Sequence, residues 1–189
     1  MKYILGILLA VIILLFNFRL IVYDEDFYND DNINSSDYVN NLIGYFKGYN
    51  QLDSKYFNEK EIIHLKDVRN LINFFIYLFY FLILIFILLL FKFYKNIFSV
   101  FIIAFLIILL ISIFIYIFDF SNLFYKFHLL AFKNDFWILN PKTDNLINFF
   151  PESFFYNVLM KILINSFLMS FVLCSIGIYN VKKHLKFSL

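Results

Sequence analysis

The chain is poor in the residues that build disulfide-linked, turn-rich or metal-binding folds. Among its 189 residues are one cysteine, two prolines, four glycines, one tryptophan and three histidines. Because a disulfide joins two cysteines, Cys174 forms none within the chain and is expected to serve packing. There is no His-Glu-x-x-His motif, Cys–His cluster, Gly-x-Ser-x-Gly elbow or glycine-rich phosphate loop. The sequence therefore predicts no metal site and no cofactor.

Long apolar runs dominate the sequence instead. Hydrophobic residues make up 62% of the chain, and the mean hydropathy is +0.78. Four runs approach the roughly 20 apolar residues that cross a bilayer, at about 3–23, 71–91, 97–118 and 158–178. The remaining polar sequence is too short to cover four such helices in a soluble fold. The prediction is an all-α integral membrane protein, a single membrane domain over residues 1–189 built as a bundle of four transmembrane helices.

Acidic residues are absent from three segments, and that absence orients the predicted spans. The N-terminal Lys2, the turn with Lys92 and Lys95, and the tail after residue 178 carry lysine but no carboxylate. All 14 Asp and Glu residues fall in the connections 24–70 and 119–157. Because cytoplasmic loops carry an excess of Lys and Arg, both termini are predicted in the cytoplasm and short helices in the two acidic connections cap the outer face. The net charge of +2 gives no reason to expect nucleic acid.

The second outer connection, residues 119–157, is predicted to contain short helices interrupted by turns. A helix through His128 is expected to end near residues 133–135. A turn is expected at Pro141, because the residue before a proline is pushed out of the α region. Thr143 or Asp144 is then predicted to cap a short helix through Phe150. This connection therefore combines turn-forming and polar residues next to the membrane.

The three histidines differ in their surroundings. His184 lies among lysines in the C-terminal tail and is expected at the surface. His64 lies in a segment without Gly or Pro that is predicted to run as one helix into the second span, with Asp67 on the same helical face. His128 lies in the other outer connection, also beside a membrane span. This placement predicts a site shared by His64 and His128, with purely structural histidines as the alternative.

Two segments carry a resemblance to a known family. One is H-L-K-D-V-R, which begins at His64, and the other is F-H-L-L-A-F-K-N-D-F-W-I-L-N-P-K-T-D-N-L-I-N-F-F-P-E-S-F-F, which begins at Phe127. Together they resemble the bacterial lipoprotein intramolecular transacylase family, whose members are four-span integral membrane proteins. The resemblance covers nearly the whole chain in helix order. It implies transfer of the sn-2 acyl chain from the diacylglyceryl group of an N-terminal cysteine to that cysteine's α-amino group, which yields an N-acyl lyso-form lipoprotein.

The resemblance also implies roles for individual residues. His64 and His128 match the two motif histidines and are expected to be catalytic. Residues expected to support or orient them are Asp67, Asn134 and Asp144, and those expected to contact substrate are Trp137, Arg69 and Tyr125. One histidine accepts the proton of the attacking amine, and the other stabilises the oxyanion or protonates the leaving glycerol oxygen. We expect His64, oriented by Asp67, to be the base, although the residues alone allow the reverse.

The expected partners are a diacylated lipoprotein substrate and membrane lipids. The protein is expected to act as a monomer in the bacterial cytoplasmic membrane, with its active site on the extracytoplasmic side. Two other functions fit the same residues. One is an outer-face phospholipid hydrolase or acyltransferase that uses both histidines, and the other is a lipid-binding accessory protein without enzymatic activity. Replacement of either histidine would leave only the accessory protein nearly unaffected.

Overall fold

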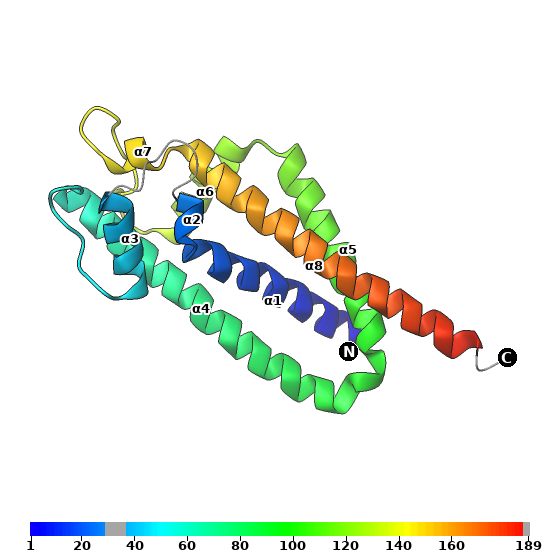
Figure 1. Cartoon of the computed structure of the whole chain (residues 1–189). Helices are drawn as coiled ribbons and strands as arrows, with labels where there is room; N and C mark the ends of the chain where they lie inside the picture. The colour runs from blue at the N-terminus through cyan, green and yellow to red at the C-terminus, as the bar shows by residue number, and fades with distance from the viewer. Residues whose placement is uncertain (29–36, 187–189) are drawn as a thin grey trace. The chain divides into compact units, whose positions relative to one another are not determined.

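A computed structural model describes residues 1–28 and 37–186 of the chain (Figure 1). Every regular element in these two ranges is a helix, which confirms the predicted all-α class. The elements are, in order, α1 (Lys2–Val22), α2 (Glu25–Tyr28), α3 (Asp37–Lys47), α4 (Glu59–Phe93), the 3₁₀ turn η1 (Tyr94–Asn96), α5 (Ile97–Ile117), α6 (Phe120–Ala131), α7 (Leu146–Phe149) and α8 (Glu152–Lys186).

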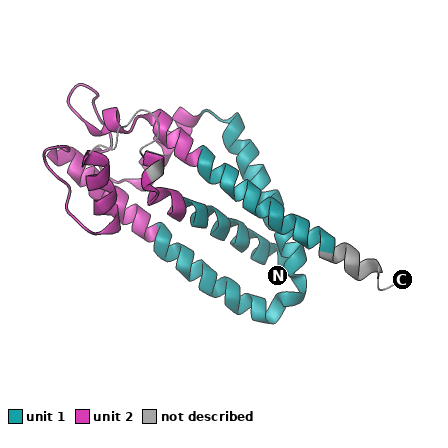
Figure 2. Cartoon of the chain, in the orientation of Figure 1, with its two compact units in different colours: residues 1–18, 75–119, 160–189 teal, residues 19–74, 120–159 magenta. Residues whose placement is uncertain are grey.

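The chain divides into two compact units (Figure 2). Unit 1 comprises Met1–Phe18, Phe75–Asp119 and Met160–Leu189, and unit 2 comprises Arg19–Phe74 and Phe120–Leu159. The long helices α4 and α8 therefore contribute residues to both units. Every residue predicted to act in the site belongs to unit 2.

Unit 1 has an apolar core between α1 and α5, composed of Leu5, Leu9, Ala10, Ile13, Val100, Ala104 and Ile108. A glycine allows the two helices to approach closely, because a Cβ on Gly6 would lie 2.4 Å from Ile103 Cγ2. A buried polar contact joins α1 to α8, where Asn17 Nδ2 donates to Ser166 Oγ at 3.1 Å. Small residues and interhelical hydrogen bonds of this kind hold helices together in membranes.

Three helical stretches in the described residues are long and apolar enough to cross a bilayer. They are Lys2–Val22, Glu59–Ile117 and Glu152–Tyr179. The middle stretch comprises α4, η1 and α5, and Figure 1 shows the chain reversing its direction at η1. Each of the four predicted membrane spans overlaps one of the helices α1, α4, α5 and α8.

Helix α4 begins with a capping box. The side chain of Asn58 accepts a hydrogen bond from Glu61 N at 3.0 Å, and the side chain of Glu61 accepts one from Asn58 N at 2.7 Å. This reciprocal arrangement satisfies two backbone donors that a helix N-terminus otherwise leaves without partners. From Glu59 the helix continues without interruption to Phe93, as the absence of Gly and Pro predicted.

Unit 2 packs α3 against α7 through aromatic side chains. Tyr38 of α3 stacks on Phe149 of α7 with ring centroids 3.9 Å apart, and Phe57 meets Phe149 edge to face at 6.2 Å. Helix α3 ends at Lys47 because Gly48 follows with a φ of 86°, a conformation that glycine adopts without steric cost.

The connection 132–145 carries no helix, as the turn signals predicted. The predicted cap of the following helix is wrong. Helix α7 begins at Leu146, its N-cap residue is Asn145, and no side chain caps it. The Asp144 carboxylate instead accepts a hydrogen bond from Asn140 N at 2.7 Å, so it closes the turn rather than starting the helix.

Candidate functional site

The first turns of α4, which belong to unit 2, carry a polar stripe. His64, Asp67 and Asn70 recur every three residues, which places them along one face of the helix. These turns precede the apolar part of α4, which begins at Leu71. His64 is buried at 6% exposure, and its Nδ1 atom has no hydrogen-bond partner among residues 1–28 and 37–186.

Helix α6 supplies the second histidine. His128 Nδ1 lies 2.7 Å from the carbonyl oxygen of Phe124, one turn earlier. A carbonyl only accepts hydrogen bonds, so Nδ1 carries the hydrogen and Nε2 of the neutral ring carries the lone pair. The backbone of α6 thus selects the tautomer of His128 and leaves Nε2 available for chemistry.

The two histidines from separate connections lie together, as predicted. The ring centroids of His64 and His128 are 6.2 Å apart. Phe132, which follows α6, contacts both rings, with centroid distances of 5.0 Å to His64 and 5.5 Å to His128. Phe132 therefore seals one side of the pair with apolar surface.

This apolar setting lowers the basicity of both imidazoles. The pKa of His64 is lowered to about 4, first by burial and then by the nearby His128 and Lys60, while the Asp67 carboxylate opposes the shift. Burial also lowers the pKa of His128, against the hydrogen bond to the Phe124 carbonyl, which raises it. Removal from water disfavours the charged form, so both rings are neutral at pH 7.

Trp137 and Tyr125 complete an aromatic wall around His128. The Trp137 ring lies 5.1 Å from the His128 ring and 5.5 Å from the Tyr125 ring, centroid to centroid. Phe124 packs edge to face against His128 at 4.4 Å. Trp137 and Tyr125, which the sequence analysis assigned to substrate binding, thus lie next to His128.

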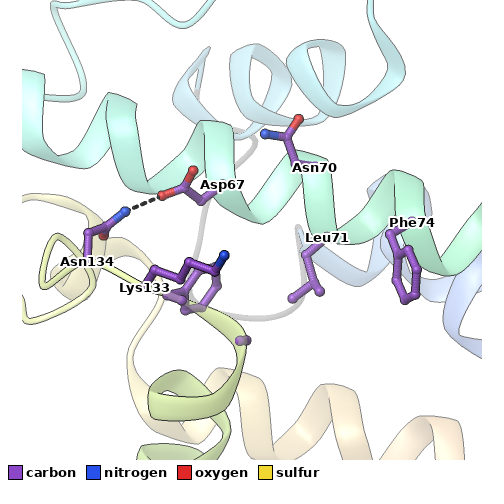
Figure 3. A pocket seen from close by; sticks show the side chains of 8 residues that line it. Asp67, Asn70, Leu71, Phe74, Lys133 and Asn134 are labelled. Atoms are coloured by element: carbon purple, nitrogen blue, oxygen red, sulfur yellow. Dashed lines mark hydrogen bonds between the residues drawn. The ribbon is translucent and has the colours of Figure 1, made fainter.

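Asp67 has a different partner from the one expected. Asn134 Nδ2 donates to Asp67 Oδ2 at 2.8 Å (Figure 3). In the described part of the chain, the Asp67 carboxylate makes no hydrogen bond to the His64 ring and acts on it through its charge. Asn134 also accepts a hydrogen bond from Phe136 N at 3.1 Å, so it ties the turn after α6 to α4.

A second set of polar contacts anchors the remainder of the connection to the start of α4. The residues that make these contacts from either side are Asn58, Lys60, Glu61 and Asp144. Glu61 is fully buried, and its carboxylate accepts a hydrogen bond from Leu146 N as well as from Asn58 N. Asp144 accepts a bond from Asn58 Nδ2 at 3.0 Å and pairs with Lys60 at 3.7 Å.

The hydrogen bond from the Asn140 backbone is the main reason why the pKa of Asp144 is lowered, against the effect of burial, and the bonds from Asn58 and Thr143 add to it. Asp144 therefore anchors the connection, and within the described residues it makes no hydrogen bond to either histidine. Sequence reasoning missed Glu61, although the Asn58-x-x-Glu61 spacing is a capping-box signal.

Arg69 lies away from the histidine pair. Its guanidinium stacks over the Tyr45 ring of α3 at 4.6 Å from the centroid. Arg69 is five positions after His64, which places the two on different faces of α4. The structure thus brings together His64, His128, Asp67, Asn134, Trp137 and Tyr125, and it places Arg69 and Asp144 outside this group.

Ionisable side chains within residues 1–28 and 37–186 form no group of three or more His, Cys, Asp or Glu that could hold a metal ion. Two neutral imidazoles beside an apolar wall are suited to proton transfer, because a neutral histidine can accept a proton and its conjugate acid can return it.

The chain is similar to known proteins over most of its length. The family model of the lipoprotein intramolecular transacylase Lit matches residues 3–155. The solved structure of Lit from Bacillus cereus, a membrane-integral protein, matches with a TM-score of 0.83 and 22% identity over 98% of this chain and 96% of that one.

Two variant structures of the Bacillus cereus protein also match, one with a histidine replaced by arginine and one by alanine. Each has a TM-score of 0.73 and 23% identity, over 100% and 98% of this chain and 93% and 94% of theirs. No curated protein sequence matches the chain. At these identities the solved structures establish a common fold. The family model spans most of the sequence, and the chain therefore belongs to the lipoprotein intramolecular transacylase family, Lit.

Proposed function

We propose that this protein moves the sn-2 acyl chain of a diacylglyceryl-cysteine to the α-amino group of the same N-terminal cysteine. The observation that carries the proposal is the pair of neutral histidines from α4 and α6, 6.2 Å apart beside an apolar wall, in a chain of this family. The amine nitrogen attacks the ester carbonyl carbon, the new N–C bond forms, and the C–O bond to glycerol breaks. The product is an N-acyl, lyso-form lipoprotein.

His128 is the base in this proposal, which exchanges the roles expected from the sequence. Its Nδ1 hydrogen is held by the Phe124 carbonyl, so Nε2 presents a lone pair. Nε2 accepts the proton of the attacking amine and then delivers it to the departing glycerol oxygen. His64, with a pKa lowered to about 4, is a weaker base at the same pH.

His64 stabilises the oxyanion in this scheme. Its buried Nδ1 has no partner in the part of the chain that the structure describes, and a buried polar group without a partner costs about 1–3 kcal/mol. An N–H of the neutral ring that donates to the substrate's carbonyl oxygen satisfies the side chain as negative charge develops there, which is the purpose of an oxyanion hole.

Supporting residues hold substrate and catalytic rings in place. Asn134 and Asp67 fix the turn after α6 against α4, and Trp137 and Tyr125 line the wall along which the glyceryl group lies. Arg69, stacked on Tyr45, contacts the outer parts of the substrate. Amine and ester belong to one molecule, so orientation alone supplies an effective molarity of up to about 10⁵–10⁸ M.

The proposed topology places the site outside the bacterial cytoplasmic membrane. Helices α1, α4, α5 and α8 each cross the bilayer once, with η1 as a cytoplasmic turn and both termini in the cytoplasm. The lysines without acidic neighbours at Lys2, Lys92 and Lys95 support this orientation. The protein works as a single membrane domain and as a monomer, in contact with membrane lipids.

Mass spectrometry of a lipoprotein's N-terminal peptide tests the function. Coexpression with the wild-type chain is expected to shift one acyl group from glyceryl oxygen to cysteine nitrogen, and His64→Asn or His128→Asn is expected to reduce the shift at least about 100-fold. His184→Asn is the matched control, because that histidine lies near the C-terminal end of α8 and has no proposed role. A diacylated peptide unchanged by the wild-type protein would reject the proposal. Release of free fatty acid in its place would favour a hydrolase.

A further inference from the structure

A cavity of about 360 Å³ lies between the start of the apolar part of α4 and the end of α6 (Figure 3). Its polar lining residues are Asp67, Asn70, Lys133 and Asn134, and its apolar ones are Leu71, Phe74, Ala131 and Phe132. The volume lies at the lower end of the roughly 300–1,000 Å³ of small-ligand sites, so the cavity suits a compact polar group.

The cavity adjoins the histidine pair without including it. Phe132 lines the cavity and also contacts the rings of both His64 and His128. Asp67 lines it from the turn of α4 that follows His64. Phe132 therefore lies between the histidine pair and this cavity, next to both.

The polar lining differs from the surroundings of the histidines, because it holds side chains of both charges and two carboxamides. Lys133 and Asn70 are exposed, and within the described residues neither side chain has a hydrogen bond or ion pair. The Asp67 carboxylate offers acceptor oxygens and is held in place by Asn134. The lining thus presents a cation, a carboxamide and a carboxylate to one small space.

Three kinds of occupant can be compared on this chemistry. An acyl chain would bury Lys133 and the Asn70 amide against methylene groups and leave them without partners, which is costly. A phosphate headgroup would approach the Asp67 carboxylate and be repelled by it. A peptide backbone presents both carbonyl acceptors and N–H donors, which match the donor groups of Lys133 and Asn70 and the acceptor oxygens of Asp67.

We propose that this cavity binds the first peptide groups of the lipoprotein substrate, those that follow the acylated cysteine. Lys133 and Asn70 donate to the peptide carbonyls, and Asp67 accepts from an N–H group. The inference rests on the proposed transacylase function. It supplies a basis for selectivity, because phospholipids share the glyceryl diester with the substrate but have no peptide.

The test compares two synthetic substrates with the full-length protein in detergent micelles. One is diacylglyceryl-cysteine followed by a short peptide, and the other is diacylglyceryl-cysteine methylamide, which lacks the following residues. Wild type is expected to have a lower KM for the longer substrate. Lys133→Gln and Asn70→Ala are each expected to raise that KM about threefold to tenfold, with kcat and the kinetics of the truncated substrate little changed.

Lys142→Gln is the matched control, because Lys142 is an exposed lysine of the same connection that does not line the cavity. Equal KM values of the wild-type protein for the two substrates, or a Lys133→Gln variant that behaves like Lys142→Gln, would overturn the peptide site while leaving the transacylase intact. Absence of N-acyl product from both substrates would instead overturn the proposed function, and this inference with it.

Discussion

Replacement of the buried Glu61 by alanine should destabilise unit 2 more than any change to a neighbouring acidic residue. The Glu61 side chain is fully buried and bonds to two backbone N–H groups, one in the capping box of α4 and one at the start of α7. The second of these contacts joins residues 85 positions apart in the sequence. Alanine removes both at once.

The magnitude follows from the two donors. Leu146 N becomes a buried donor without a partner, at about 1–3 kcal/mol, whereas Asn58 N lies in a more exposed position and loses only a cap, at about 1 kcal/mol. The sum is about 3 kcal/mol. For a domain of this size that corresponds to a fall in Tm of about 10 °C, at about 2–4 °C per kcal/mol.

Thermal unfolding of the purified protein in detergent measures this effect. Glu61→Gln keeps one carbonyl oxygen as an acceptor and should lose about half as much stability. Glu59→Ala is the control, because Glu59 is exposed in the first turn of α4 and contributes only about 0.3–1 kcal/mol through the helix dipole. Equal Tm values for the Glu61→Ala and Glu59→Ala variants would refute the reasoning.

Two further predictions concern protonation and topology. Because the pKa of His64 falls to about 4 on folding from an ordinary value of 6.5, the unfolded chain binds more protons between these values. The free energy of unfolding should therefore rise by about 3 kcal/mol from pH 4 to pH 6.5, and a His64→Asn variant that retains the full rise would contradict the assignment. In a Cys174→Ser background, an impermeant maleimide should label Ser54→Cys in intact cells and Lys95→Cys only after the membrane is opened. Labelling of Lys95→Cys in intact cells would reverse the proposed orientation.

Local signals predicted the helices well. The four apolar runs and the uninterrupted segment before the second span correspond to α1, α4, α5 and α8, because span length and the absence of Gly and Pro act within each segment. The boundaries were less well predicted. Asp144 was expected to cap α7, but short polar side chains such as Asp serve turns as readily as helix caps, and here the carboxylate bonds to Asn140 N.

In the candidate site, too, the sequence predicted what local patterns encode and did not predict contacts between distant segments. Motif resemblance indicated His64 and His128, and helical spacing placed Asp67 on the face of His64. The pairing of Asp67 with Asn134 joins residues 67 positions apart, and the bond from Glu61 to Leu146 N spans 85. No local pattern specifies which of several nearby amides reaches a given carboxylate.

The sequence by itself determined an all-helical chain, its candidate spans, its family and the two histidines, because hydrophobic length and motif identity are written along the chain. Only the tertiary structure decided that the rings of His64 and His128 lie 6.2 Å apart, that Phe132 covers both, and that a cavity adjoins them. The low pKa of His64 also belongs to the tertiary structure, since it arises first from burial and then from the charges that folding brings near. Proximity and desolvation are properties of packing between segments, and they turn two ordinary histidines into a candidate active site.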